Sequence, residues 1–313
     1  MIEVKNLCKY YGDKKAVDDI SFSVKKGEIL GLLGPNGAGK TTTMNIITGY
    51  ISCTSGKVIV NDMNIMEKPN EVKKCIGYLP EQPPLYMDMT VDEYLSFAYD
   101  LKKVQDEKKK HISEIMNKVK ISNVSQSLIK NLSKGYKQRV GIAQALLGSP
   151  ENIILDEPTV GLDPGQIIEI RDLIKILGKE HTIILSSHIL SEISAVCDKI
   201  IIINNGKIAA DNTTENISRV NENEYRYVVK IKGKQNTVTD VLSSIDGVLH
   251  INSNAADQTG IFDYNIECSK DVREDMFFAL AKSRNPILAL RQNEMTLEET
   301  FIQITSGTYG EVQ

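Results

Sequence analysis

The sequence has no tryptophan, few cysteines and no long apolar run. Its longest purely aliphatic run is Ile200 to Ile203, far below the roughly 18 to 20 apolar residues needed to cross a bilayer. The five cysteines are odd in number, lie far apart and form no C-x-x-C pair, so we expect reduced thiols rather than a disulfide framework. The first residues, Met1 to Tyr11, contain no apolar core of signal-peptide length, which argues against export. These absences favour a cytoplasmic protein that does not span the membrane.

An excess of positive charge is also missing, because Lys and Arg number 37 against 41 for Asp and Glu, a formal net charge of −4. A protein that coats duplex DNA gains affinity by neutralising phosphates, so we expect no nucleic-acid partner. The hydrophobic share of 41% and the charged share of 25% are ordinary for a folded chain. At about 150 residues per domain, the 313 residues suffice for two domains.

Short β-rich runs alternate with helical stretches as far as about Asn205, which predicts an α/β fold around a largely parallel sheet. Between Thr90 and Pro150 helical periodicity replaces the strand signal, and Thr90 with Glu93 predicts a capping box near the start of this helical insertion. Apolar runs that predict buried strands cover Glu28–Leu33, Asn152–Leu155, Thr182–Leu185 and Ile200–Ile203.

A polar, asparagine-rich junction, Asp211 to Glu224, precedes a second pattern of elements. We therefore expect a first domain over residues 1–219 and an accessory domain over residues 220–313. The second pattern reads βαββαβ, the plan of a ferredoxin-like α+β domain, followed by a terminal helix near Leu297–Thr305. The predicted strands are Tyr225–Lys232, Val248–Asn252, Phe262–Cys268 and Ile287–Gln292, and the predicted helices are Thr237–Ser244 and Val272–Ser283.

The segment Gly34 to Thr41, G-P-N-G-A-G-K-T, fits the pattern G-x-x-x-x-G-K-[ST], with a predicted strand before it and an apolar helix after it. In such a loop, glycines let successive backbone N–H groups face a phosphate chain at a helix N-terminus. Lys40 can neutralise the terminal phosphates, and the Thr41 hydroxyl can ligate Mg²⁺. The candidate nucleotide-binding residues of this loop are Gly34, Asn36, Gly37, Ala38, Gly39, Lys40, Thr41 and Thr42.

Two adjacent carboxylates, Asp156 and Glu157, follow the predicted strand Asn152–Leu155. They lie at its carboxyl end, where α/β folds place their ligands. Alternation along the chain points the two side chains in opposite directions. One of them can therefore hold Mg²⁺ while the other orients or deprotonates an attacking water.

The segment Leu132 to Arg139, L-S-K-G-Y-K-Q-R, resembles the signature of the ATP-binding cassette family, about twenty residues before the acidic strand. Gly161, Leu162 and Asp163 match the D-loop of that family, and His188 in S-S-H matches its switch histidine. The resemblance covers about residues 1–219 and implies a P-loop ATPase cassette, with a RecA-like core and a helical insertion, that uses ATP and Mg²⁺. It makes Asp156 a metal ligand and Glu157 and His188 the catalytic residues, and it makes Tyr11, before Gly12, the aromatic that stacks on adenine.

The signature itself implies a dimer. Ser133 is predicted to be the N-cap of the following helix. In this fold class the start of that helix, an anion-binding group, cannot reach the γ-phosphate bound by its own chain. In the family, two cassettes enclose two ATP molecules, each held by the phosphate loop of one and the signature of the other, so Ser133 and Gly135 would complete the site of a partner copy in a homodimer. Asp163 of the D-loop is a further candidate nucleotide-binding residue. Lys134 replaces the usual first glycine of the signature and Tyr136 the glutamine, so we expect retained binding with altered kinetics.

The glutamine loop of the family follows a strand that corresponds here to Cys75–Leu79, and the matching segment reads G-Y-L-P-E-Q. Either Glu81 or Gln82 can occupy its metal-sensing position, and the sequence leaves both open.

Because the sequence contains no apolar run long enough to span a membrane, a transport function would need separate membrane subunits. The apolar stretch after Gln82, which contains Pro84, Leu85, Tyr86, Met87 and Met89, is where the resemblance places their docking helix. The signature and this stretch, with the added C-terminal domain, resemble the bacterial ABC-2 type export ATPases most. They imply an ATP-hydrolysing subunit bound to the inner face of the membrane beside a permease. The alternatives are a soluble cassette ATPase acting on ribosomes or DNA, and an ATP-gated regulatory switch.

Overall fold

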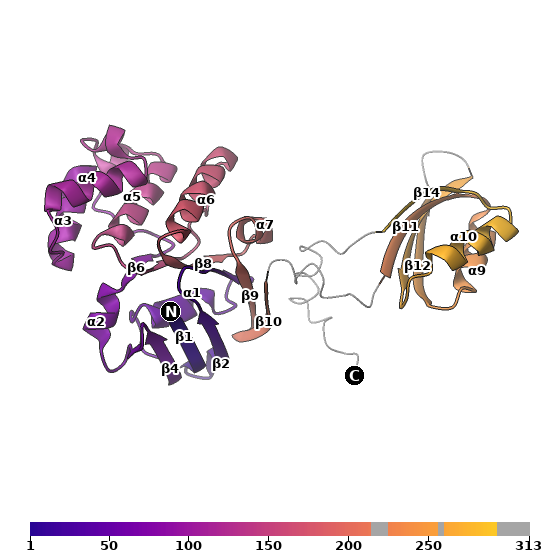
Figure 1. Ribbon diagram of the computed structural model, residues 1–313, viewed down its shortest axis with the longest axis horizontal. Coiled ribbons are helices and arrows are strands. Elements are labelled where there is room, and N and C mark those ends of the chain that lie inside the picture. The colour runs from indigo at the N-terminus through magenta and orange to yellow at the C-terminus, as the bar shows by residue number, and fades with distance from the viewer. Residues whose placement is uncertain (214–224, 256–259, 293–313) are drawn as a thin grey trace. The chain divides into compact units, whose positions relative to one another are not determined.

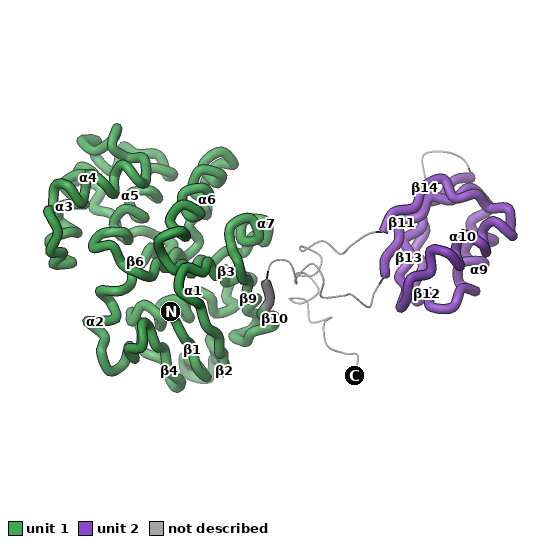
Figure 2. The backbone as a smooth tube through the Cα atoms, viewed as in Figure 1, with its two compact units in different colours: residues 1–214, 303–313 green, residues 215–302 purple. Residues whose placement is uncertain are grey.

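The computed structural model describes residues 1–213, 225–255 and 260–292. They fall into two compact units, the first over residues 1–213 and the second over residues 225–292, drawn in green and purple in Figure 2. The expected domain boundary at residues 219 and 220 and the expected helix at Leu297–Thr305 lie outside the described residues. Within the described ranges, no helix is long and apolar enough to cross a membrane.

A six-stranded sheet in the order β10-β9-β3-β8-β7-β6 forms the centre of the first unit. Its neighbouring strands are parallel except for β10, which runs antiparallel to β9. The prediction of buried parallel strands is confirmed, because every residue of β3, β7 and β8 is buried. In chain order the strands are β3 (Ile29–Leu33), β6 (Ile76–Leu79), β7 (Asn152–Leu155), β8 (Thr182–Ser187), β9 (Lys199–Asn204) and β10 (Lys207–Thr213).

A second, antiparallel sheet in the order β2-β1-β4-β5 was not predicted from the sequence. It comprises β1 (Ile2–Tyr11), β2 (Lys14–Val24), β4 (Ser55–Val60) and β5 (Met63–Asn64). The register of β1 against β2 shifts between Val4 and Leu7, where Asn6 has a positive φ of 47°. Such bulges interrupt the period of two that identifies a strand in a sequence.

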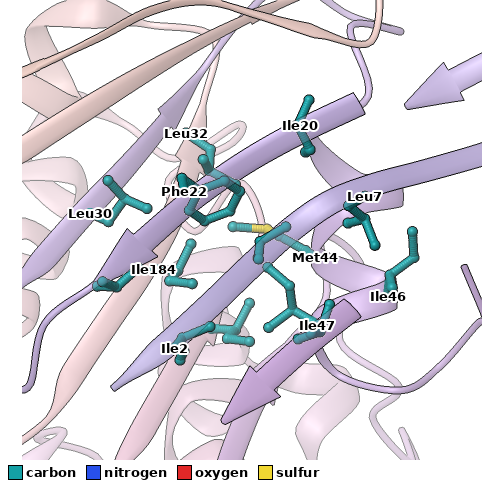
Figure 3. Packing of buried hydrophobic residues seen from close by; sticks show 14 of the residues in the cluster. Ile2, Leu7, Ile20, Phe22, Leu30, Leu32, Met44, Ile46, Ile47 and Ile184 are labelled. Atoms are coloured by element: carbon teal, nitrogen blue, oxygen red, sulfur yellow. The ribbon is translucent and has the colours of Figure 1, made fainter. Parts of the chain in front are cut away.

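Helix α1 (Lys40–Ile47) joins the two sheets through a buried apolar cluster of the first unit. Figure 3 shows Met44 and Ile47 of this helix beside Ile2 of β1 and Leu32 of β3. The segment between β3 and α1 is therefore held at both ends by buried elements. This anchoring fixes the position of the glycine-rich loop.

The helical insertion lies beside the parallel sheet (Figure 1) and contains α3 (Val91–Lys102), α4 (Lys108–Lys118) and α5 (Lys134–Leu146), with short 3₁₀ turns η1 (Ser122–Val124) and η2 (Ile129–Asn131). The predicted capping box is confirmed. The Glu93 N–H donates to Thr90 Oγ1 at 3.2 Å, and the Thr90 N–H donates to Glu93 Oε2 at 2.8 Å. Helix α5 packs on β6, while α2 (Pro69–Lys74), α6 (Pro164–Gly178) and α7 (Leu190–Ser194) complete the unit.

The second unit has the element order strand, helix, strand, strand, helix, strand, so the predicted pattern of elements is confirmed. Its elements are β11 (Tyr225–Lys232), α9 (Gln235–Ser243), β12 (Val248–Ala255), β13 (Ile261–Cys268), α10 (Arg273–Lys282) and β14 (Ile287–Gln292). The strands form one antiparallel sheet in the order β12-β13-β11-β14. Buried side chains of the strands, such as Tyr227 and Tyr264, share one core with Leu242 of α9 and Met276 of α10.

Candidate active site

The glycine-rich loop leaves β3 at Gly34 and enters α1 at Gly39. A β-carbon at Gly34 would lie 2.2 Å from the Ile203 carbonyl oxygen, and one at Gly39 would lie 2.5 Å from that of Ala16. Gly39 also has a φ of 110°, which only glycine adopts without strain. The loop is thus pressed between β9 and β2, and larger residues at these two positions would displace it.

A cavity of about 420 Å³ opens over this loop. Its walls come from β1, the loop, the start of α1 and the carboxyl ends of the parallel strands, which is where open α/β sheets bind ligands. The sequence-predicted residues that line it are Tyr11, Asn36, Gly37, Ala38, Gly39, Lys40, Thr41, Thr42, Glu81, Glu157 and His188. The fold therefore gathers residues from five distant parts of the chain around one space.

The buried ammonium group of Lys40 marks the polar centre of this cavity. It donates to the carbonyl oxygen of Gly34 at 2.7 Å and lies 3.5 Å from Oε1 of Glu157. The other oxygen of Glu157, Oε2, is 2.9 Å from Nδ1 of His188. Glu157 thus lies between the ammonium group of Lys40 and the imidazole of His188, and these two contacts fix the direction of its carboxylate.

Asp156 is fully buried at the end of β7 and faces the start of α1. Its Oδ1 accepts hydrogen bonds from Ser186 Oγ at 2.6 Å and from Thr41 Oγ1 at 3.3 Å. Burial raises the pKa of Asp156 above its usual range, although the two hydroxyl donors oppose that shift. Oδ2 of Asp156 is buried without a hydrogen-bond partner among the described residues. An orphaned carboxylate oxygen beside a threonine hydroxyl is an oxygen donor set of the kind that Mg²⁺ prefers, so these residues fit that ion.

The two carboxylates face different partners, although the turn at Glu157 rather than strand alternation separates them. Asp156 contacts Thr41, whereas Glu157 contacts Lys40 and His188. Glu157 has a φ of 47°, and its backbone N–H donates to Ser186 Oγ at 2.9 Å. This hydrogen bond stabilises the turn that separates the two side chains.

Sequence reasoning missed Ser186 as part of the site and also missed three cavity residues, Lys14, Ala16 and Val160. The sequence did carry a signal for Ser186, because Ser186 is the next-to-last residue of β8, and the carboxyl ends of neighbouring parallel strands meet at one edge of a sheet. Lys14 and Ala16 belong to β2 of the antiparallel sheet, which the sequence did not reveal.

The structure separates the two candidates for the glutamine-loop position. Glu81 lines the cavity over the loop, whereas Gln82 lines a different cavity of about 550 Å³. The bend that follows β6 therefore directs these two adjacent side chains into different spaces.

The predicted signature residues do not line the cavity over the loop of their own chain. Ser133 caps α5, because its Oγ accepts from the Tyr136 N–H at 3.4 Å, and Ser133 and Gly135 line a separate cavity of about 360 Å³. Asp163 caps α6 by accepting from the Gln166 N–H at 2.9 Å. Gly34 also lies off the cavity walls, and it contributes the carbonyl that binds Lys40.

A phosphate loop that ends in a buried lysine, with two differently oriented carboxylates and a histidine at the same sheet edge, defines a nucleotide-hydrolysing site of the P-loop class. The family described as ABC transporter matches residues 17–160. Bacitracin transport ATP-binding protein BcrA of Bacillus licheniformis is 36% identical, with 98% of each chain covered. Linearmycin resistance ATP-binding protein LnrL of Bacillus subtilis (strain 168) is 32% identical, over 98% of this chain and 99% of its own length.

Among solved structures, the dimeric structure of MJ0796, a bacterial ABC transporter cassette, has a TM-score of 0.63 and 26% identity, over 68% of this chain and 99% of its own. The chain belongs to the family of ABC transporter ATP-binding proteins. It is an ATPase that binds nucleotide, and its first unit has the P-loop cassette fold. The relatives do not favour the ribosome- or DNA-acting alternative or the regulatory switch.

Proposed function

We propose that the chain is the ATP-hydrolysing subunit of an ABC-2 type exporter, which dimerises around two ATP molecules and drives a separate membrane permease. The observation that carries this proposal is the array of Lys40, Glu157 and His188 on one cavity beside the Asp156–Thr41 pair. The names of the relatives that match almost the whole chain, transport and resistance ATP-binding proteins, support the exporter.

In this mechanism Lys40 exchanges its contact with Glu157 for the terminal phosphates of ATP. Thr41 and Asp156 would hold Mg²⁺, which neutralises charge on the β- and γ-phosphates when bound. Glu157 orients an attacking water and accepts its proton, and His188 keeps the carboxylate in place through the 2.9 Å contact. Glu81, the candidate that lines the cavity, is favoured over Gln82 for the metal-sensing role.

We assign Tyr11 the role of stacking on the adenine ring. It ends β1 on the cavity wall, its side chain is 52% exposed, and Lys9 Nζ lies 5.1 Å from its ring centroid. An exposed aromatic at the mouth of a phosphate site offers a flat face for a base.

The separation of the signature from the loop supports a homodimer. Ser133 and Gly135 line their own cavity at the start of α5, so they are free to meet the phosphates held by a second copy. The dimeric state of the related cassette supports the same arrangement.

The permease contact and the accessory domain complete the proposal. Tyr86 and Met87 are 53% and 45% exposed, so this stretch can receive a permease segment at the inner face of the membrane.

We assign residues 1–219 to the cassette and residues 220–313 to the accessory domain. Its sheet order β12-β13-β11-β14, with α9 and α10 in its core, supports a ferredoxin-like domain.

Co-purification tests this function. The chain is expressed with and without the membrane protein encoded by a neighbouring reading frame, and membrane fractions are washed at high salt. We expect the chain in the membrane fraction only with that partner, together with ATPase activity. Equal recovery in the soluble fraction under both conditions would contradict a permease-bound subunit.

A further inference from the structure

Glu192, on the short helix α7, is a buried carboxylate that the proposed ATPase mechanism does not use. The residue is only 8% exposed, and within the described ranges it forms no ion pair with a cationic side chain. Burying a carboxylate without a cation costs more free energy than burying an apolar side chain of similar size. Packing alone therefore does not explain why a glutamate occupies this position.

One oxygen of Glu192 joins the two segments that carry Glu157 and His188. Its Oε2 accepts a hydrogen bond from Thr159 Oγ1 at 2.5 Å and another from Ser187 Oγ at 3.2 Å. Thr159 lies two residues after Glu157, and Ser187 directly precedes His188. Both hydroxyl donors are buried, so water does not readily replace this bridge.

The two serines at the end of β8 serve different carboxylates. Ser186 Oγ donates to Asp156 at 2.6 Å and accepts from the backbone N–H of the next residue after that aspartate. Ser187 Oγ instead donates to Glu192 and accepts from the Ile189 N–H at 3.0 Å. Adjacent residues of a strand point to opposite faces of the sheet. The segments that leave β7 and β8 are therefore linked twice, once through Asp156 and once through Glu192.

Helix α7 fixes the place of this second carboxylate. The helix packs on β8 and β3, and a β-carbon at Gly31 of β3 would collide with the side chain of Ile193. Strand β3 leads directly into the glycine-rich loop. The strand that positions the loop thus also positions the helix that carries Glu192.

We propose that Glu192 is a positioning residue of the ATPase, which keeps Oε2 of Glu157 at 2.9 Å from Nδ1 of His188 by accepting from Thr159 and Ser187. The inference rests on the proposed function, which makes Glu157 the base. Glu192 does not line the nucleotide cavity, so it acts only through its two hydroxyl donors. A displacement of about 1 Å in an active site can lower a rate by roughly a hundredfold, which gives such a bridge a measurable effect.

ATPase assays of the full chain at varied ATP concentration test this role. Glu192→Leu removes the acceptor and should lower kcat at least about tenfold, with KM changed by less than about twofold because the phosphate loop is untouched. Glu192→Gln should keep most of the rate, since its amide oxygen can accept from both hydroxyls. Thr159→Val removes one donor and should also lower kcat. The matched control, Thr48→Val, removes a buried hydroxyl that lies off the nucleotide cavity and should keep the wild-type rate.

Histidine NMR measures the positioning without hydrolysis. In a chain labelled with ¹³C-histidine, the ring signal of His188, assigned with His188→Ala, reports its contact with Glu157. We expect Glu192→Leu and Thr159→Val to shift this signal in the direction that Glu157→Gln shifts it, and Thr48→Val to leave it in place. The signals of the other three histidines should stay unchanged, which verifies that each variant is folded.

A wild-type kcat or an unshifted His188 signal in Glu192→Leu would overturn the proposal. Thr159→Val carries the same test should Glu192→Leu fail to fold. Equal loss of activity in Glu192→Gln and Glu192→Leu would also overturn it, because the negative charge rather than the acceptor would then be required. Unimpaired hydrolysis in Glu157→Gln would count against the proposed function alone, since the NMR readout does not depend on the identity of the base.

Discussion

The ammonium nitrogen of Lys40 lies 3.5 Å from Oε1 of Glu157, and both side chains are buried. Under the proposed function, the residue that would bind the terminal phosphates and the residue that would activate water are therefore paired with each other. A γ-phosphate competes with Glu157 for the same cation. In the proposed mechanism, ATP binding would free the carboxylate of Glu157 from Lys40, so that it could act as the base only when nucleotide is present.

Lys40→Ala should remove most nucleotide affinity. The variant loses a charge-assisted contact to phosphate, of about 1.5–3 kcal/mol, which corresponds to roughly a 10- to 150-fold weaker Kd. Isothermal calorimetry with ATP and Mg²⁺ measures this change. Lys14→Ala, at an exposed lysine on the rim of the same cavity, is the control and should have a smaller effect. Unaltered affinity in Lys40→Ala would disprove the phosphate-loop assignment.

Glu157→Gln should bind ATP but hydrolyse it at least about a hundredfold more slowly, because an amide cannot accept the proton from water. With ATP and Mg²⁺ present, the variant should elute as a dimer from a sizing column, since the bound nucleotide is not cleaved. Glu114→Gln, at an exposed position of α4, should leave the rate unchanged. Full activity in Glu157→Gln would require a different base.

Ser133→Ala should lower the ATPase rate while each chain still binds ATP, because Ser133 lies off the nucleotide cavity of its own chain. The substitution also removes a helix cap worth about 1 kcal/mol. Thr90→Ala removes the cap of α3 at similar cost and is the matched control for stability. If both variants lose activity equally, the effect of Ser133 is structural and the shared-site interpretation is wrong.

Local and short-range patterns predicted most of the site. The phosphate loop, the Thr90–Glu93 capping box and the strand Asn152–Leu155 depend on neighbours within a few residues, so they are visible in the sequence. The antiparallel sheet was missed because bulges near Asn6 interrupt its alternation.

Long-range contacts were the hardest to predict. Lys102 binds carbonyls more than forty residues away at the end of α5, and only the packing of α3 against α5 brings them together. The same limit applies to Glu81 and Gln82. Only the folded chain shows that Glu81 lines the nucleotide cavity and that Gln82 lines a separate cavity of about 550 Å³.

Lys102→Met should destabilise the first unit and change its dependence on pH. Three carbonyl oxygens at the end of α5 lose their donor, at a cost of about 1–3 kcal/mol each if they stay dry. In the wild type, burial lowers the pKa of Lys102 from 10.5 to about 8. At pH values between these two pKa values, Lys102 binds more protons in the unfolded chain than in the folded chain. The contribution of Lys102 to the free energy of unfolding therefore rises with pH in this range.

Urea denaturation of both proteins between pH 7 and pH 10 isolates this contribution, because the other titrating groups are common to wild type and variant. The difference in unfolding free energy, wild type minus Lys102→Met, should increase across the upper part of that range. Lys103→Met, at the exposed neighbour that donates to no described carbonyl, should show neither effect. A difference that is flat with pH would mean that Lys102 keeps its proton throughout. In that case the hydrogen bonds to the three carbonyl oxygens would stabilise the charged ammonium enough to offset the cost of its burial.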